Sequence, residues 1–101
     1  MDNSVSMIVI GVTNPDAPDA LEAYQRIALP LFLQAGGKPA GKYRVIGQPA
    51  GSHVSTLIAQ MDFPSEAAVA GVFESPAYRE ALGNRDRAFL DLNVYLTRRM
   101  A

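Results

Sequence analysis

Two helices begin within the stretch FPSEAAVAGVFESPAYREALGNR, residues 63–85. Ser65 is a good N-cap residue, and Glu66 follows it in the first turn, where a carboxylate complements the helix dipole. Ser75 and Pro76 repeat the signal more strongly, because a hydroxyl cap is followed by proline at the first helical position. The sequence therefore predicts one helix that begins at Glu66 and another that begins at Pro76.

The second of these helices is predicted to place four large side chains on one stripe, at steps of four, three and four residues. They are Tyr78, Leu82, Arg85 and Phe89. Tyr78 and Arg85 are two turns apart, about 10 Å along the helix. A guanidinium there can bind a carboxylate or an enolate while the phenol donates a second hydrogen bond. Alternatively, Arg85 pairs with a neighbouring carboxylate, and Tyr78 packs with its hydroxyl at the surface.

A strand and a long helix are predicted upstream of this stretch. Val5–Thr13 is rich in β-branched residues and is typical of a strand that is covered on both faces. Asp16 is expected to cap a helix that runs to Ala35, and the glycine pair that follows ends it with a left-handed cap. Tyr24 lies on the core stripe of this helix, so it either packs in the core or directs its hydroxyl into a cavity beneath the sheet.

Three further strands are predicted in the remainder of the chain. Residues 43–46 and Val54–Asp62 are joined by a loop punctuated with glycine and proline, which predicts a hairpin. His53 lies at the end of this hairpin. Its imidazole suits proton transfer near neutral pH, but exposed polar residues are also expected at such a position. Leu92–Thr97 alternates apolar and polar residues and forms the last strand.

The predicted order, β-α-β-β-α-α-β, is that of a ferredoxin-like α+β domain with a four-stranded antiparallel sheet. We expect one domain over residues 5–98 and a flexible N-terminus over residues 1–4. The helices would cover one face of the sheet, while the other face carries valine, methionine, tyrosine and threonine rather than charges. A second copy packed sheet to sheet would cover that face, so the sequence predicts a homodimer that closes a dimeric α+β barrel.

FPS at 63–65, SPAY at 75–78 and Arg85 resemble the motifs of the bacterial "domain of unknown function 1330" family. The resemblance covers residues 8–96 and implies a dimeric α+β barrel of ferredoxin-like subunits whose biochemical role is undefined. Residues 46–47 are Ile-Gly where the family often has Glu-Gly, and residues 72–73 are Val-Phe where it often has tryptophan. Any role of that glutamate is therefore not transferred. Further matching positions are Phe73, Tyr24, Gln25, Pro30, Leu31, Gly36 and Gly37.

Composition narrows the possible functions. The 101 residues are 49% hydrophobic and 19% charged, with a net charge of −1, which gives no general attraction to nucleic acid or anionic lipid. There is no cysteine and a single histidine, so we expect no disulfide, no metal site and no cofactor. The longest apolar run, residues 27–33, is too short to span a bilayer, and no positive charges precede the first apolar run as they would in a secretory signal. We expect a cytoplasmic protein without membrane or nucleic-acid partners.

Three functions remain open from the sequence. The first is a homodimer that binds a small polar or anionic organic molecule between sheet and helices, with Tyr78, Arg85, Tyr24 and His53 as candidate ligand-binding residues. The second, from fold-level analogy, is a cofactor-independent monooxygenase or isomerase of the dimeric α+β barrel type. Such an enzyme needs an inward-facing base. The third is a structural or regulatory dimer without ligand, which requires a pocket filled by side chains.

Overall fold

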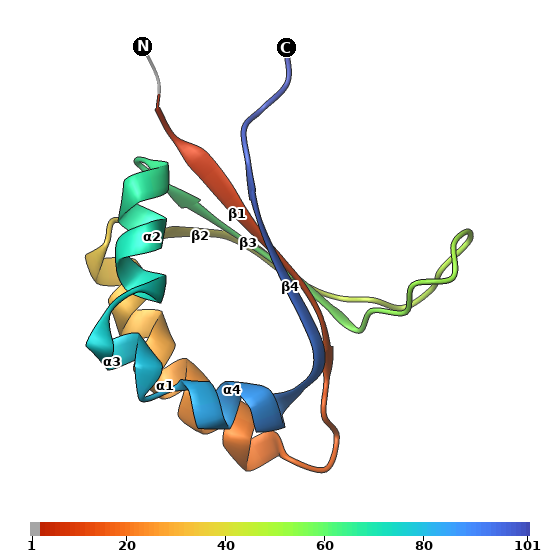
Figure 1. Ribbon diagram of the computed structural model, residues 1–101. Helices are drawn as coiled ribbons and strands as arrows, with labels where there is room; N and C mark the ends of the chain where they lie inside the picture. The colour runs from red at the N-terminus through yellow and green to blue at the C-terminus, as the bar shows by residue number, and fades with distance from the viewer. Residues whose placement is uncertain (1–2) are drawn as a thin grey trace.

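The computed structural model describes residues 3–101, which form one antiparallel sheet with helices on one of its faces (Figure 1). Residues 1 and 2 of the predicted flexible N-terminus lie outside the described part of the chain. The strands follow the order β2-β3-β1-β4 across the sheet. The elements are β1 (Val5–Thr13), α1 (Pro18–Gln34), β2 (Lys38–Arg44), β3 (Leu57–Phe63), α2 (Glu66–Phe73), α3 (Pro76–Arg79), α4 (Leu82–Ala88) and β4 (Phe89–Thr97). The predicted ferredoxin-like α+β fold is confirmed.

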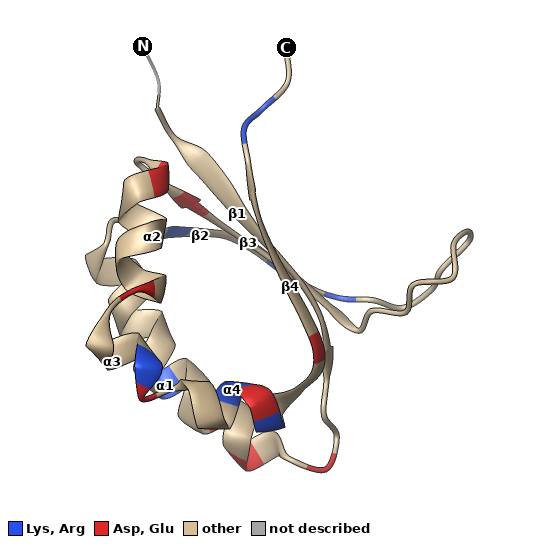
Figure 2. Cartoon of the chain, in the orientation of Figure 1, with Lys and Arg blue, Asp and Glu red and all other residues tan. Residues whose placement is uncertain are grey.

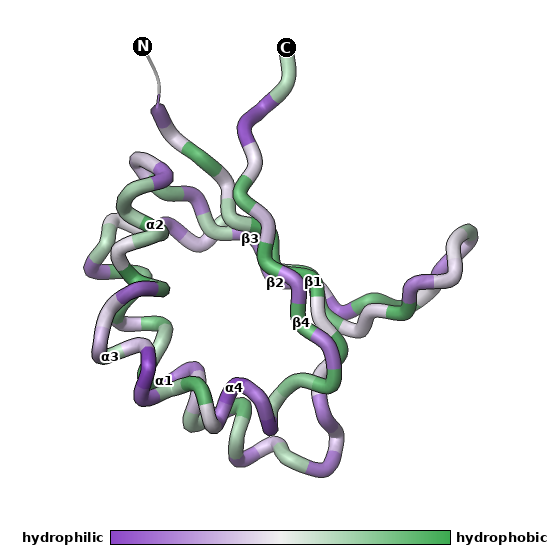
Figure 3. Tube along the Cα trace, in the orientation of Figure 1, coloured by the Kyte–Doolittle hydropathy of each residue, from purple (hydrophilic) through white to green (hydrophobic). Residues whose placement is uncertain are grey.

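The core lies between the sheet and the helices. In β1, Val5 and Met7 face the helices and are 4% exposed, while Ile8 and Ile10 point to the opposite, open face. Apolar and polar residues also alternate along β4 (Figure 3). One large buried cluster joins the inner face of the sheet to α1, α2 and α3. Its buried members are Val5, Met7, Ala28, Phe32, Phe63, Val69, Val72 and Tyr78.

The start of α1 differs from the prediction. Ala17, not Asp16, is the N-cap residue, and no side chain caps this end. Asn14 instead fixes the turn before the helix, because its side-chain oxygen accepts from the backbone N–H of Asp16 at 3.0 Å and its carbonyl accepts from that of Ala17 at 3.2 Å. This turn leads into Pro18 at the first helical position. The other end is as predicted, since the helix ends at Gln34 and Gly36 has a φ of 93°.

The two serine caps are confirmed, but the second helix is shorter than predicted. Ser65 accepts from the N–H of Ala68 at 3.2 Å, and Ser75 accepts from the N–H of Tyr78 at 3.1 Å. After α3 the N–H of Ala81 bonds to the carbonyl of Tyr78, three residues back. This tighter turn interrupts the helix, so the predicted continuous stripe from residue 78 to residue 89 is wrong.

The hairpin of β2 and β3 also differs in its boundaries. The strand expected over residues 43–46 spans Lys38–Arg44, and its partner begins at Leu57 rather than at residue 54. The segment between them, residues 45–56, projects from the body of the molecule (Figure 1). Ile46, expected within a strand, is 95% exposed in this projection. Proline and glycine in β2 masked its strand character, but both are tolerated at a sheet edge with a bulge, which lies between Pro39 and Gly41.

Candidate functional site

A cavity of about 360 Å³ lies between α1 and the inner face of the sheet, and we call it the sheet–helix pocket. Its sheet side is apolar, with Met7 and Val9 of β1 among the lining residues. Tyr24 and Phe32 contribute from α1. The polar residues of the lining are few, and the remaining surface is aliphatic or aromatic. These polar residues are Tyr24, Gln25 and Lys42. Gln60 also lines the pocket, but its side-chain amide donates to Ser6 and Asp62 on the open face of the sheet.

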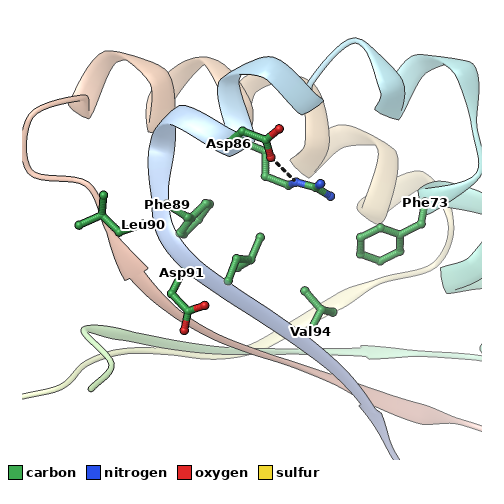
Figure 4. A pocket seen from close by; sticks show the side chains of 8 residues that line it. Phe73, Asp86, Phe89, Leu90, Asp91 and Val94 are labelled. Carbon is green, nitrogen blue, oxygen red and sulfur yellow. Dashed lines mark ion pairs between the residues drawn. The ribbon is translucent and has the colours of Figure 1, made fainter. Parts of the chain in front are cut away.

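A second cavity of about 460 Å³ lies between α4 and β4, and we call it the outer pocket (Figure 4). It is more polar, because Arg85, Asp86 and Asp91 line it. The Nε of Arg85 lies 3.6 Å from a carboxylate oxygen of Asp86, the ion pair drawn in Figure 4. The two pockets are neighbours, since four residues line both of them. These shared residues are Phe73, Phe89, Leu92 and Val94.

Tyr24, Tyr78 and Arg85 form a hydrogen-bonded chain beside the two pockets. The hydroxyl oxygens of Tyr24 and Tyr78 are 2.8 Å apart. Nη1 of Arg85 donates to the Tyr78 hydroxyl at 3.5 Å, and the guanidinium carbon lies 5.9 Å from the centroid of the same ring. Tyr24 lines the sheet–helix pocket and Arg85 lines the outer pocket. Tyr78 is 2% exposed and links them from within the core.

The direction of these hydrogen bonds follows from what each group can donate. Arg85 carries only donors, so the Tyr78 oxygen accepts from it. The buried O–H of Tyr78 needs an acceptor of its own, and the oxygen of Tyr24 lies within reach. Tyr24 then accepts from Tyr78 and keeps its own O–H for another partner. Because Tyr24 lines the sheet–helix pocket, this O–H can serve a molecule bound there.

The electrostatics of these hydrogen-bonded side chains make them hydrogen-bond donors rather than bases. Burial raises the pKa of the Tyr24 phenol far above its ordinary value. Tyr24 is therefore neutral and acts as a donor rather than as a proton acceptor. Burial acts to lower the pKa of the Arg85 guanidinium, but the hydrogen bond to Tyr78 and the charge of Asp86 outweigh it and leave the pKa raised. Arg85 is therefore a permanent cation next to the pockets.

Aromatic side chains hold the Tyr78 ring in place. The ring of Phe73 packs edge-on against Tyr78 with centroids 4.9 Å apart, and Phe32 does the same at 6.1 Å. Tyr24 meets the ring of Phe89 edge-on at 6.0 Å. Edge-to-face pairs of this kind contribute about 0.5–1.5 kcal/mol each beyond the area they bury. These contacts hold the tyrosine rings of α1 and α3 in place and so fix the positions of their hydroxyls.

The structure brings three of the four candidate residues together and leaves the fourth apart. Tyr24, Tyr78 and Arg85 are joined by hydrogen bonds. The hydroxyl of Tyr78 is buried, in contrast to the alternative that placed it at the surface, whereas Arg85 does pair with a neighbouring carboxylate. His53 lies in the projecting segment, where its Nε2 is 3.3 Å from a carboxylate oxygen of Asp91 and its side chain is 67% exposed. Their ligand-binding roles stay predictions.

Sequence reasoning did not single out Lys42 and Gln60 as pocket residues, although both line the sheet–helix pocket. The period-two alternation of a strand would have placed Lys42 on the face opposite Tyr43. That signal was hidden because the start of β2 was not predicted. Within residues 3–101, no group of three histidine, aspartate or glutamate side chains is placed to hold a metal ion. In the same residues, no helix has the length and apolar character needed to cross a membrane.

The fold and the pockets define a small ferredoxin-like α+β protein with a cavity beneath its sheet. The family model described as "Domain of unknown function (DUF1330)" matches residues 7–98, and the chain belongs to this family. The resemblance seen in the sequence is therefore confirmed. No curated protein matches the chain.

Solved structures share this fold. A protein of unknown function from Rhodopseudomonas palustris is 22% identical, with a TM-score of 0.83 over 100% of this chain and 85% of that chain. A dimeric, ferredoxin-like protein of unknown function from Bacteroides fragilis is 10% identical, with a TM-score of 0.61 over 93% and 94%. A monooxygenase candidate from Lactobacillus acidophilus is 12% identical, with a TM-score of 0.70 over 96% of this chain and 45% of that chain. Identities this low show a common fold alone.

Proposed function

We propose that this protein is a homodimer that binds a small polar or anionic organic molecule in the sheet–helix pocket. The observation that carries the proposal is the chain of Tyr24, Tyr78 and Arg85 beside a mostly apolar cavity. The ligand's apolar part would lie against the sheet, and one of its oxygens would accept from the Tyr24 hydroxyl. The positive charge of the Arg85 guanidinium would stabilise negative charge on that oxygen, either through a charge-assisted hydrogen bond or through electrostatic attraction.

The open volume of the pocket supports binding over a dimer without ligand. Small-molecule sites commonly enclose about 300–1,000 Å³ and combine an apolar lining with a few fixed polar groups. The sheet–helix pocket, at about 360 Å³, fits both criteria. A dimer without ligand requires a pocket filled by side chains, whereas Phe73 and Phe89 line this pocket and leave it open.

The enzyme alternative has less support from the geometry. A cofactor-independent monooxygenase or isomerase needs a base that faces its substrate. The raised pKa of Tyr24 opposes that role, and His53, which lies on the projecting segment, pairs with Asp91 of β4. The likeness to the monooxygenase candidate of L. acidophilus is one of fold. Binding without turnover is therefore the function we favour.

The homodimer is supported by the open face of the sheet. Tyr43, Ile58 and Ile10 are neighbours across three strands of this face, and Ile8 lies opposite Tyr95. Tyr43 and Tyr95 are more than half exposed, at 56% and 52%. A second copy packed on this face would remove these side chains from water, at about 25 cal/mol per Å² of apolar surface. Light scattering should give twice the chain mass of 10.9 kDa, and a monomer would contradict the proposed dimer.

Native mass spectrometry of the purified protein tests the binding function. We expect the wild type to carry a small molecule that Arg85→Leu loses. Arg87→Leu is the matched control, because Arg87 lies on the same helix but pairs with Asp19 at the surface, 3.4 Å away. Tyr24→Phe provides a second variant that keeps the ring and removes only the donor. A ligand retained by both Arg85→Leu and Tyr24→Phe would refute the assigned site.

A further inference from the structure

Lys42 is a charged residue on the inner face of an outer strand. The register pairs Lys42 of β2 with Ala59, Ala59 with Val9, and Val9 with Val94. All four residues of this cross-strand row line the sheet–helix pocket. Three of them are small or aliphatic, and the fourth ends the row with an ammonium group. Lys42 is thus a cation at the β2 end of an apolar surface.

No carboxylate of residues 3–101 forms an ion pair with Lys42. The ion pairs within residues 3–101 are made by other cations, and none of them includes Lys42. Lysines on edge strands commonly discourage pairing with other chains. Lys38 suits that role too, but it pairs in register with Asp62, whose side chain contacts that of Ser6 on the open face. Lys42 therefore differs from Lys38 in the face it occupies and in the cavity it lines.

Arg85 provides a second cation at the other end of the same surface. It lines the outer pocket together with Val94 and Phe89, which also line the sheet–helix pocket. β2 and β4 are the outer strands of the sheet. Three strand spacings of about 4.8 Å therefore separate the two ends, a span of about 14 Å. Between them the lining is mostly apolar.

We infer that Lys42 is a second anion-binding residue of the sheet–helix pocket and that the pocket takes an apolar organic diacid. This inference rests on the proposed binding function and names the class of its ligand. One carboxylate lies at Lys42, the hydrocarbon part crosses Ala59 and Val9, and the other carboxylate lies near Tyr24 and Arg85. Gln25, which also lines the pocket, supplies a neutral hydrogen-bonding group.

The expected contribution of Lys42 is modest because the residue is exposed. Ion pairs in water-accessible positions typically change an equilibrium constant by about two- to fivefold. The effect should also weaken with salt, since screening is strong beyond about 10 Å at 0.1 M ionic strength. Arg85, which is less exposed and hydrogen-bonded, should have the larger effect.

Titration calorimetry with defined probes tests the inference. The probes are linear diacids from hexanedioate to dodecanedioate and the monoacids of matching length. We expect one of the longer diacids to bind the wild type about two- to fivefold more tightly than its matched monoacid. Lys42→Gln should remove this preference and leave the monoacid affinity unchanged. Lys38→Gln, with the same charge change on the other face of β2, should keep it.

The outcomes separate this inference from the proposed function. If monoacids and diacids bind equally well and Lys42→Gln changes neither, the second anion site is refuted while the pocket stands. If Lys38→Gln abolishes the preference as Lys42→Gln does, the effect is one of net charge and the inference also fails. If Arg85→Leu leaves every affinity unchanged, the proposed site itself is wrong. If no probe binds the wild type at millimolar concentration, the diacid assignment is overturned.

Discussion

Replacing Tyr78 with phenylalanine isolates the hydroxyl that joins the two halves of the site. The hydroxyl lies 2.8 Å from that of Tyr24 and accepts from Arg85 at 3.5 Å. Its loss removes hydrogen bonds that contribute about 0.5–1.5 kcal/mol each, and the longer bond belongs at the lower end. Tyr24 lines a pocket and can bond to water instead, so we expect a total loss of about 1 kcal/mol in the free energy of unfolding.

The ring of Tyr78 should matter more than its hydroxyl. It packs edge-on against Phe73 and Phe32 and is almost fully buried. Tyr78→Ala should therefore cost about 3–5 kcal/mol, enough to threaten folding. Tyr78→Phe keeps these contacts and should lower Tm by about 4–8 °C in a domain of this size.

Urea unfolding, followed by circular dichroism, gives both free energies. Tyr78→Phe should fold cooperatively with an unchanged slope, and the titration of the Tyr24 phenol should shift because its hydrogen bond with Tyr78 is gone. A Tyr78→Phe protein as unstable as Tyr78→Ala would show that the hydroxyl is essential to the fold. No loss of stability, together with an unchanged Tyr24 titration, would show that the hydrogen-bonded chain is absent in solution.

Three other perturbations follow from local features. Hydrogen bonds from Ser6 and Gln60 lower the pKa of Asp62. Ionised Asp62 therefore stabilises the fold above its unfolded pKa, and this stabilisation is lost as pH falls through the lower folded pKa. Ser6→Ala should weaken this pH dependence of stability in acid unfolding curves. The Tyr24 pKa is raised, so its stabilisation is full below about pH 10 and lost above it, and Tyr24→Phe should show a shallower alkaline loss in urea unfolding. Gly36→Ala should destabilise by about 1 kcal/mol at its φ of 93°, whereas Gly71→Ala in α2, with open space around it, should stabilise by about 0.5–1 kcal/mol; thermal melts that rank them otherwise would refute the backbone argument.

The helix caps could be predicted because their signals are local. Ser65 and Ser75 lie within three residues of the N–H groups they accept from, so the sequence alone contains the interaction. The start of α1 was mispredicted for a related reason, since Asp16 and Asn14 are equally capable and the turn geometry decides between them. The break after α3 depends on tertiary packing around Ala81, which is fully buried.

The candidate site could be predicted only in part. Periodicity placed Tyr24 on an inward stripe, and the family resemblance singled out Tyr78 and Arg85. The hydrogen bond between Tyr24 and Tyr78 joins residues 54 positions apart, and no local sequence pattern encodes a contact over such a separation. His53 was selected because its imidazole suits proton transfer. The periodicity of apolar residues cannot show that residues 45–56, which include His53, project away from the rest of the domain (Figure 1). Charges of both signs also intermix along α3 and α4 (Figure 2), so charge patterning did not distinguish Arg85 from its neighbours.

Methyl NMR of the methionines tests most directly whether the sheet–helix pocket binds a ligand. Met7 and Met61 line this pocket, while Met100 is 90% exposed and outside its lining, so it serves as an internal control. With carbon-13 at the methionine methyl groups, titration with decanoate and decanedioate should shift the Met7 and Met61 signals saturably and leave Met100 unchanged. Arg85→Leu should suppress these shifts. Saturable shifts that spare both Met7 and Met61, or no shifts at millimolar probe, would contradict a binding site beneath the sheet.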